Sequence, residues 1–224
     1  MGNDRVSRRP AYVRDGIALG AAVSLFAVSF GVLATASGLS VAKTCAMSLL
    51  VFTGASQFAA VAVVDAGGST GAAIGSALLL AARNAAYGLA MAPILRGSRL
   101  RRAVVAQVIV DESTGMATAQ PERADAERAF YATGIALFAF WNIGTLVGAL
   151  AGTALGDPET LGLDAAFPAG FLALLGPHLQ RPGGRVAAFG GGLIALALLP
   201  FAPAGVPVIA ASLAALPALA VSRR

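Results

Sequence analysis

Apolar stretches alternate with short polar or charged segments along the whole 224-residue chain. A helix that spans the hydrocarbon core of a bilayer needs about 20 apolar residues, so this pattern is typical of membrane-spanning helices. Eight stretches can be delimited, the fourth and the sixth being weak, at residues 16–37, 41–66, 70–95, 103–120, 129–155, 166–179, 186–201 and 205–221. The pattern predicts an all-α polytopic membrane protein.

The composition agrees with this prediction. Hydrophobic residues make up 57% of the chain and charged residues only 12%, whereas soluble domains carry about 25% charged residues. A soluble globule of this size could not bury so much apolar surface. We therefore expect a cytoplasmic N-terminal tail at residues 1–14, a single transmembrane permease domain at residues 15–224, and no enzymatic activity.

The net charge of +5 comes from arginines that cluster at the ends of apolar stretches, with few aromatic residues between them. Cytoplasmic loops carry an excess of basic residues, so this distribution indicates membrane topology and not nucleic-acid binding. Both termini are expected in the cytoplasm, which requires an even number of crossings. The arginines that place them there are Arg5, Arg8, Arg9, Arg14, Arg223 and Arg224.

The basic loop at residues 96–102 constrains the number of crossings. It holds four arginines, yet it would lie outside if each of the first three stretches crossed once. A re-entrant second stretch, interrupted at the small and polar residues 53–57, returns the loop to the cytoplasm. The fourth stretch must then also be re-entrant, because Arg123 and Arg128 follow it.

We therefore predict six full transmembrane helices plus two re-entrant or broken segments, at residues 41–66 and 103–120. The alternative is eight full spans with one misplaced basic loop. Irregular backbone at membrane depth is tolerated only where it is covered by protein or lines a cavity, so the two segments mark the expected substrate path.

Ionisable residues within the spans are few. Arg83 lies near the middle of the third stretch, with Tyr87 one helical turn later, and Asp111 and Glu112 lie midway along the fourth. Each costs about 2.5–3.5 kcal/mol to insert, so a pair between Arg83 and one of the carboxylates is expected. The pair is either a structural ion bridge or a site where a carboxylate binds protons or a substrate ammonium group.

Two glycine-containing segments allow two interpretations each. A helix broken at Gly54, Ala55, Ser56 and Gln57 would present backbone N–H groups to a substrate carboxylate, but small residues also serve helix contacts. A glycine stripe in the fifth stretch predicts close helix packing, within the chain or against a second subunit. It consists of Gly144, Gly148, Gly152 and Gly156.

No sequence motif indicates a metal or a cofactor. His178 is the only histidine and Cys45 the only cysteine, and no phosphate-binding loop, nucleophile elbow or zinc-binding helix motif is present. We expect no metal, no cofactor and no use of ATP by this chain.

Four segments resemble one known family. The sequence LVFTGASQF at residues 50–58 is followed by AARNAAYG at 81–88 with AMAP at 90–93, DES at 111–113, and GLDAAFP at 162–168. In this order they resemble the AzlC/BrnF family, the large subunit of bacterial branched-chain amino acid exporters. Asn84 stands where that family has histidine and Val110 where it has threonine, so a proton-coupling role tied to the histidine does not carry over.

The resemblance implies a secondary transporter subunit in the bacterial cytoplasmic (inner) membrane, which exports leucine, isoleucine, valine or methionine with a small AzlD-like membrane subunit of about four spans. Our hypothesis places the carboxylate of the substrate at residues 54–57 and near Arg83, and its ammonium group at Asp111 or Glu112, which couple export to protons. The alternatives are a channel or facilitator for a small polar solute, and a structural subunit of a two-chain membrane complex.

Overall fold

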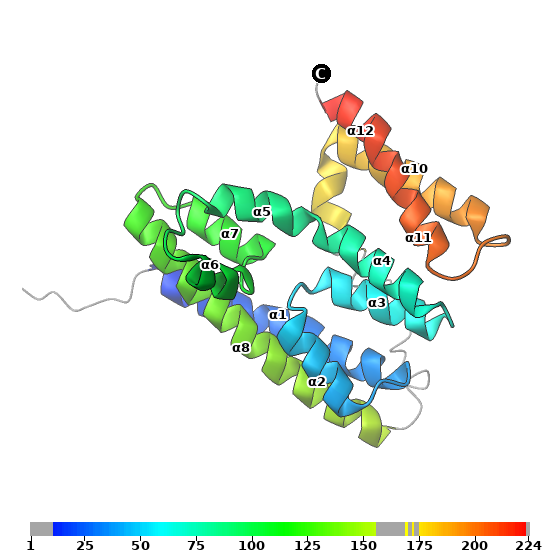
Figure 1. Cartoon of the computed structure of the whole chain (residues 1–224), viewed down its shortest axis with the longest axis horizontal. Coiled ribbons are helices and arrows are strands. Elements are labelled where there is room, and N and C mark those ends of the chain that lie inside the picture. The colour runs from blue at the N-terminus through cyan, green and yellow to red at the C-terminus, as the bar shows by residue number, and fades with distance from the viewer. Residues whose placement is uncertain (1–10, 156–168, 170–171, 173–174, 223–224) are drawn as a thin grey trace, which may run out of the picture.

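The computed structural model of the chain describes residues 11–155, 169, 172 and 175–222. Every regular element in these residues is a helix, which confirms the predicted all-α class (Figure 1). The elements are α1 (Ala11–Ala36), α2 (Val41–Leu50), α3 (Ala55–Asp65), α4 (Thr70–Ala81), α5 (Arg83–Met91), α6 (Arg99–Ala106), α7 (Asp111–Thr118), α8 (Arg123–Leu155), η3 (Gly176–Gln180), α10 (Pro182–Leu198), α11 (Val206–Ala211), η4 (Ser212–Ala214) and α12 (Ala215–Ser222).

Two of the described helices, α1 and α8, are long and apolar enough to cross a membrane. They lie side by side (Figure 1) and run in the same direction, since Gly16 of α1 lies at Thr133 of α8 and Gly31 lies at Thr145. Their outer faces carry exposed aliphatic side chains, among them Leu25 at 72% exposure. Such surfaces are stable against lipid and not against water.

Glycines allow α1 and α8 to approach backbone to backbone. A Cβ atom built on Gly144 would lie 2.8 Å from the Cβ of Ala27, and one built on Gly148 would collide with the carbonyl oxygen of Val28. Gly152 lies equally close to α1, whereas Gly156 lies outside the described residues. The glycine stripe thus packs within the chain along its described part.

Three of the first four predicted apolar stretches are interrupted. The second is divided into α2 and α3 by residues 51–54, and the fourth is divided into α6 and α7 by residues 107–110. The third is also divided, at Ala82, where the N–H of Ala85 bonds to the carbonyl of Ala82 in a tighter turn. Arg83 therefore begins α5 and does not lie within an unbroken span.

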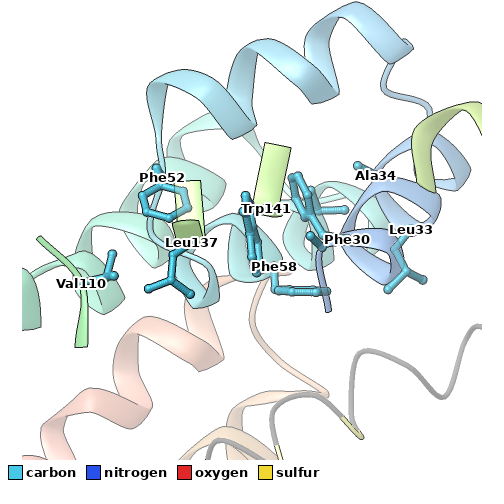
Figure 2. Close-up of a cluster of buried hydrophobic side chains, with 10 residues drawn as sticks. Phe30, Leu33, Ala34, Phe52, Phe58, Val110, Leu137 and Trp141 are labelled. Atoms are coloured by element: carbon cyan, nitrogen blue, oxygen red, sulfur yellow. The ribbon is translucent and has the colours of Figure 1, made fainter. Parts of the chain in front are cut away.

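A cluster of aromatic rings fills the space between α1, α8 and the first interruption. The rings of Phe30 and Trp141 are stacked with centroids 6.2 Å apart, and Phe52 and Phe58 meet Trp141 edge to face. Figure 2 shows these rings next to Leu137, which is 2% exposed. Aromatic pairs of this kind contribute about 0.5–1.5 kcal/mol beyond the burial of their area, so the cluster fixes the interruption against α8.

The C-terminal helices form a separate layer. Helix α10 packs against α11 and α12, and Figure 1 shows them on the side of α4 away from the α1 and α8 pair. Close contacts such as Gly75 with Ile209 join this layer to α4. Half of the sixth predicted stretch lies outside the described residues.

The substitution Gly148→Ala tests the glycine contact. Because the added methyl group meets the backbone of α1 and not a flexible side chain, the two helices must separate, and overpacking of this kind costs about 1–3 kcal/mol. We expect a lower midpoint of thermal unfolding in detergent. The control is Gly192→Ala on α10, where the methyl group meets nothing within 4 Å; equal midpoints for the two variants would contradict the contact.

Candidate functional site

The two interruptions border one cavity. Its volume is about 120 Å³, and it lies between the start of α3, the start of α7, the start of α5 and the inner faces of α1 and α8. The lining residues are Val23, Phe26, Phe52, Thr53, Gly54, Ala55, Phe58, Arg83, Val110, Asp111, Glu112, Leu137 and Trp141.

The charged residues predicted from the sequence meet at one part of this cavity. Nη1 of Arg83 lies 3.6 Å from Oδ2 of Asp111, and both side chains are partly exposed, at 33% and 40%. Glu112 also lines the cavity. The predicted pair between Arg83 and a carboxylate is therefore present, and Asp111 is the carboxylate that forms it.

Tyr87 lies beside this group without lining the cavity. It is half-buried one turn after Arg83 and interacts electrostatically with Asp111, Arg83 and Glu112. Of the residues predicted to contact the substrate, Tyr87 therefore lies near the charged groups and is not part of the cavity lining.

The first interruption has a glycine at its turning point. Gly54 adopts φ +62° and ψ −92°, in the region that favours glycine. Its N–H donates to Oε1 of Gln57 at 3.2 Å. A helix leaves its first N–H groups without acceptors of its own, so those of Ala55 and Ser56 remain at the end of α3 that borders the cavity.

The side chains of Ser56 and Gln57 do not line the cavity. They are 1% and 0% exposed, and the amide oxygen of Gln57 is used to hold Gly54. Of the segment predicted to contact substrate, Gly54 and Ala55 line the cavity together with Thr53. Gln57 therefore stabilises the interruption, and its side chain does not line the cavity.

The second interruption is also held by a side chain that accepts a hydrogen bond from the backbone N–H before the helix. Val110 is extended, and its N–H donates to Oγ of Ser113, three residues later, at 3.1 Å. Asp111 and Glu112 occupy the first turn of α7, so they lie midway along the fourth stretch, directly after its interruption. Carboxylates are stabilised at this end by the helix dipole, by about 0.3–1 kcal/mol each.

A hydrogen bond joins the two interruptions. Nε2 of Gln107 donates to the carbonyl oxygen of Leu49 at 2.8 Å. The last carbonyl groups of a helix lack N–H donors within it, so Gln107 supplies a donor to the end of α2 from the loop that precedes α7. The two interruptions are thus fixed relative to each other.

The apolar wall of the cavity was not assigned from the sequence. Val23 from α1 and Leu137 and Trp141 from α8 form it with Phe52 and Phe58. Figure 2 shows the last four of these side chains in the buried cluster. The ring of Trp141 lies 3.6 Å from where a Cβ of Gly54 would stand. The only feature of the sequence that could have indicated this wall was the pair of phenylalanines, Phe52 and Phe58, that flank residues 53–57.

The described residues contain no group of three or more histidine, cysteine, aspartate or glutamate side chains that could hold a metal ion. The cavity has a charged part, formed by one guanidinium and two carboxylates, and an apolar part, formed by aliphatic and aromatic side chains.

These features are those of a helical membrane protein: apolar side chains are exposed on its outer faces, and two broken helices and an ion pair border one cavity. Residues 18–155 match the family described as AzlC protein. The chain belongs to the AzlC family.

Two similar proteins are also described as membrane proteins. An uncharacterized membrane protein of Helicobacter pylori strain 26695 is 27% identical over 177 residues, which cover 78% of this chain and 77% of that protein. Another from Helicobacter pylori strain J99 is 26% identical over 159 residues, which cover 70% and 69%. No solved structure matches the chain significantly.

The substitution Gly54→Ala tests the geometry of the first interruption. An L-residue at this φ and ψ is strained by about 1–3 kcal/mol, although the added methyl group has room beside Trp141. We expect the free energy of unfolding, measured by titration with sodium dodecyl sulfate, to fall by that amount. Gly88→Ala, at a helical glycine with open space around it, should lose no stability, and the same loss in both variants would refute the strain.

Proposed function

We propose that this chain is the large subunit of a secondary transporter that exports branched-chain amino acids, leucine, isoleucine, valine and also methionine, in exchange for protons. The observation that carries the proposal is the division of one cavity into a charged part and an apolar part. A free amino acid with an aliphatic side chain likewise has a charged part, its ammonium and carboxylate groups, and an apolar part, its side chain. Membership of the AzlC family supports this class of substrate.

The charges of the cavity suit a zwitterion. The carboxylate of the substrate binds the N–H groups at the start of α3 and the guanidinium of Arg83, since a helix N-terminus favours anions. The ammonium group binds Asp111 or Glu112. Three ionisable groups then lie in one site that also holds both charges of the substrate.

The size of the cavity suits an aliphatic side chain. An engineered protein cavity of about 150 Å³ holds benzene, and the cavity here measures about 120 Å³. The aliphatic part of the substrate lies against Val23, Leu137 and Trp141. An aromatic amino acid would require the wall to move.

Proton coupling is assigned to the two carboxylates. Asn84 replaces the histidine that the family resemblance leads one to expect, so Asp111 and Glu112 are the titratable groups left in the cavity lining. Protonation from the outer side would release the ammonium group there, and loss of the proton to the cytoplasm would restore the site. Ionisable groups at membrane depth commonly serve as proton relays.

The proposed topology has six full spans, one of which is the third stretch with its division at Ala82, and two re-entrant or broken segments. Both termini lie in the cytoplasm of a bacterium, with the chain in the inner membrane. The parallel course of α1 and α8 supports it, since the charged first turns of both helices lie at one end. A small AzlD-like membrane subunit completes the transporter. No cofactor and no enzymatic step are part of the proposal.

Efflux of labelled leucine from loaded cells that express both subunits tests this function. We expect export that requires both chains, that a protonophore abolishes, and that the double variant Asp111→Asn, Glu112→Gln lacks. The matched control is Asp15→Asn, Asp125→Asn, which removes two carboxylates that do not line the cavity and should retain export.

Each contrary outcome has a separate meaning. Efflux that persists with the protonophore would indicate a facilitator. Retained uphill export by the Asp111 and Glu112 variant would remove both residues from the coupling mechanism. Absence of efflux for every branched-chain amino acid, with both chains in the membrane, would refute the substrate.

The substitution Val23→Phe tests the apolar wall. Val23 is half-buried on α1 and lines the cavity, so a larger ring there reduces the space for the substrate side chain. One methylene group in an apolar pocket is worth about 1–3 kcal/mol, and we expect efflux of leucine to fall about tenfold relative to that of valine. Leu25→Phe, on the exposed face of α1, should leave the ratio unchanged; an unchanged ratio for Val23→Phe would place the substrate elsewhere.

A further inference from the structure

A second cavity lies outside the site described above, in a groove between α5 and α6. Its volume is about 470 Å³. Small and apolar side chains form its floor, including Ala85 and Gly88 of α5, Ala92 directly after α5, and Ala103 and Ala106 of α6. Between Ala85 and Ala92 the groove extends for about 10 Å along α5, at 1.5 Å per residue.

Two arginines border this apolar groove. Arg99 and Arg102 line it, and at a spacing of three residues they lie on one face of α6. Both are exposed, and neither has an acidic partner among the described residues. Two positive charges thus stand beside an apolar floor without an anion to neutralise them.

Arg101, between them in sequence, has a different role. Its Nη2 donates to Oε1 of Glu127 at 2.8 Å and to the hydroxyl of Tyr131 at 3.0 Å. These bonds hold α6 against the beginning of α8. One face of α6 is therefore tied to the protein, while Arg99 and Arg102 remain available.

The contact with α8 also places α6 at the edge of the membrane. Charged residues occur in α8 only up to Arg128, and residues 129–155 contain none. Glu127, to which Arg101 binds, lies where the apolar part begins. In addition α6 exposes Leu100 at 76% and Val104 at 67%, so it has the basic and apolar character of a helix that lies in a membrane interface.

We propose that this groove binds an anionic phospholipid, with its phosphate between Arg99 and Arg102 and an acyl chain on the floor formed by α5 and α6. Basic pockets between membrane helices recognise anionic head groups in this way. The apolar floor selects a lipid over a soluble phosphate, because only the lipid covers it. The site is separate from the transport cavity and does not depend on the proposed substrate.

Gly88 provides a direct test of the acyl-chain position. A Cβ atom built on it meets nothing within 4 Å, so Gly88→Leu fills the groove without a clash in the empty protein. Gly192→Leu on α10 is the matched control, since Gly192 has equally open surroundings. For the head group, Arg99→Gln, Arg102→Gln is compared with Arg14→Gln, Arg128→Gln, which removes the same charge away from the groove.

The experiment titrates dioleoyl phosphatidylglycerol into the purified full-length chain in detergent and follows the midpoint of thermal unfolding. Phosphatidylcholine and glycerol 3-phosphate serve as parallel probes. We expect saturable stabilisation by phosphatidylglycerol alone. The paired arginine variant should bind about 30-fold more weakly, which corresponds to about 1 kcal/mol for each arginine at an anionic surface. Gly88→Leu should lose the stabilisation, and both controls should keep it.

Four results would overturn the proposal. Two concern the ligand: phosphatidylcholine or glycerol 3-phosphate stabilises the protein as much as phosphatidylglycerol does. The third is an unchanged affinity for phosphatidylglycerol in the paired arginine variant. The fourth is an unchanged affinity in Gly88→Leu together with loss of binding to a co-expressed small subunit, which would assign the groove to a protein partner. Arg99→Lys, Arg102→Lys, which keeps both charges, should bind the lipid and so separates loss of charge from loss of folding.

Discussion

The contact between α1 and α8 is the interaction on which the rest of the structure depends. Glycines at Gly16, Gly20 and Gly31 on one helix, and at Gly144 and Gly148 on the other, let the two backbones meet. Van der Waals packing is the main attraction between helices in lipid, where there is no hydrophobic driving force between them. This contact brings Val23 and Trp141 to the same wall and fixes the surface on which the broken helices rest.

The broken helices are stable because protein groups satisfy their backbones. In a bilayer no water is available for an unpaired N–H or carbonyl group. Gln57 and Ser113 each bind the N–H at the start of their helix, and Gln107 binds a carbonyl at the end of α2. The first residues of α3 and α7, among them Ala55 and Asp111, line the cavity.

The ion pair between Arg83 and Asp111 combines structure and chemistry. The 3.6 Å between Nη1 of Arg83 and Oδ2 of Asp111 is too long for a hydrogen bond, and both side chains are partly exposed and line the cavity. A charged ligand in the cavity can therefore reach either group. This accessibility is the physical reason for regarding the pair as part of a binding site.

The sequence by itself determined which segments are apolar, that the second and fourth of them are interrupted, and which charges require partners; the division of the third at Ala82 was not predicted. These properties are local: Gly54 interrupts its stretch through its own backbone conformation, and Arg83 requires an anion wherever it is inserted. It also indicated the glycine stripe, because a four-residue repeat lies on one helix face.

The tertiary structure decided how those elements meet. Residues 54, 83, 111 and 141 are far apart in the sequence, and only the packing of α1, α3, α5, α7 and α8 brings them to one cavity. It also decided that Gln57 faces its own helix start and that Trp141 forms a cavity wall. Such outcomes depend on which side chains fill the space between helices, and local spacing does not contain that information.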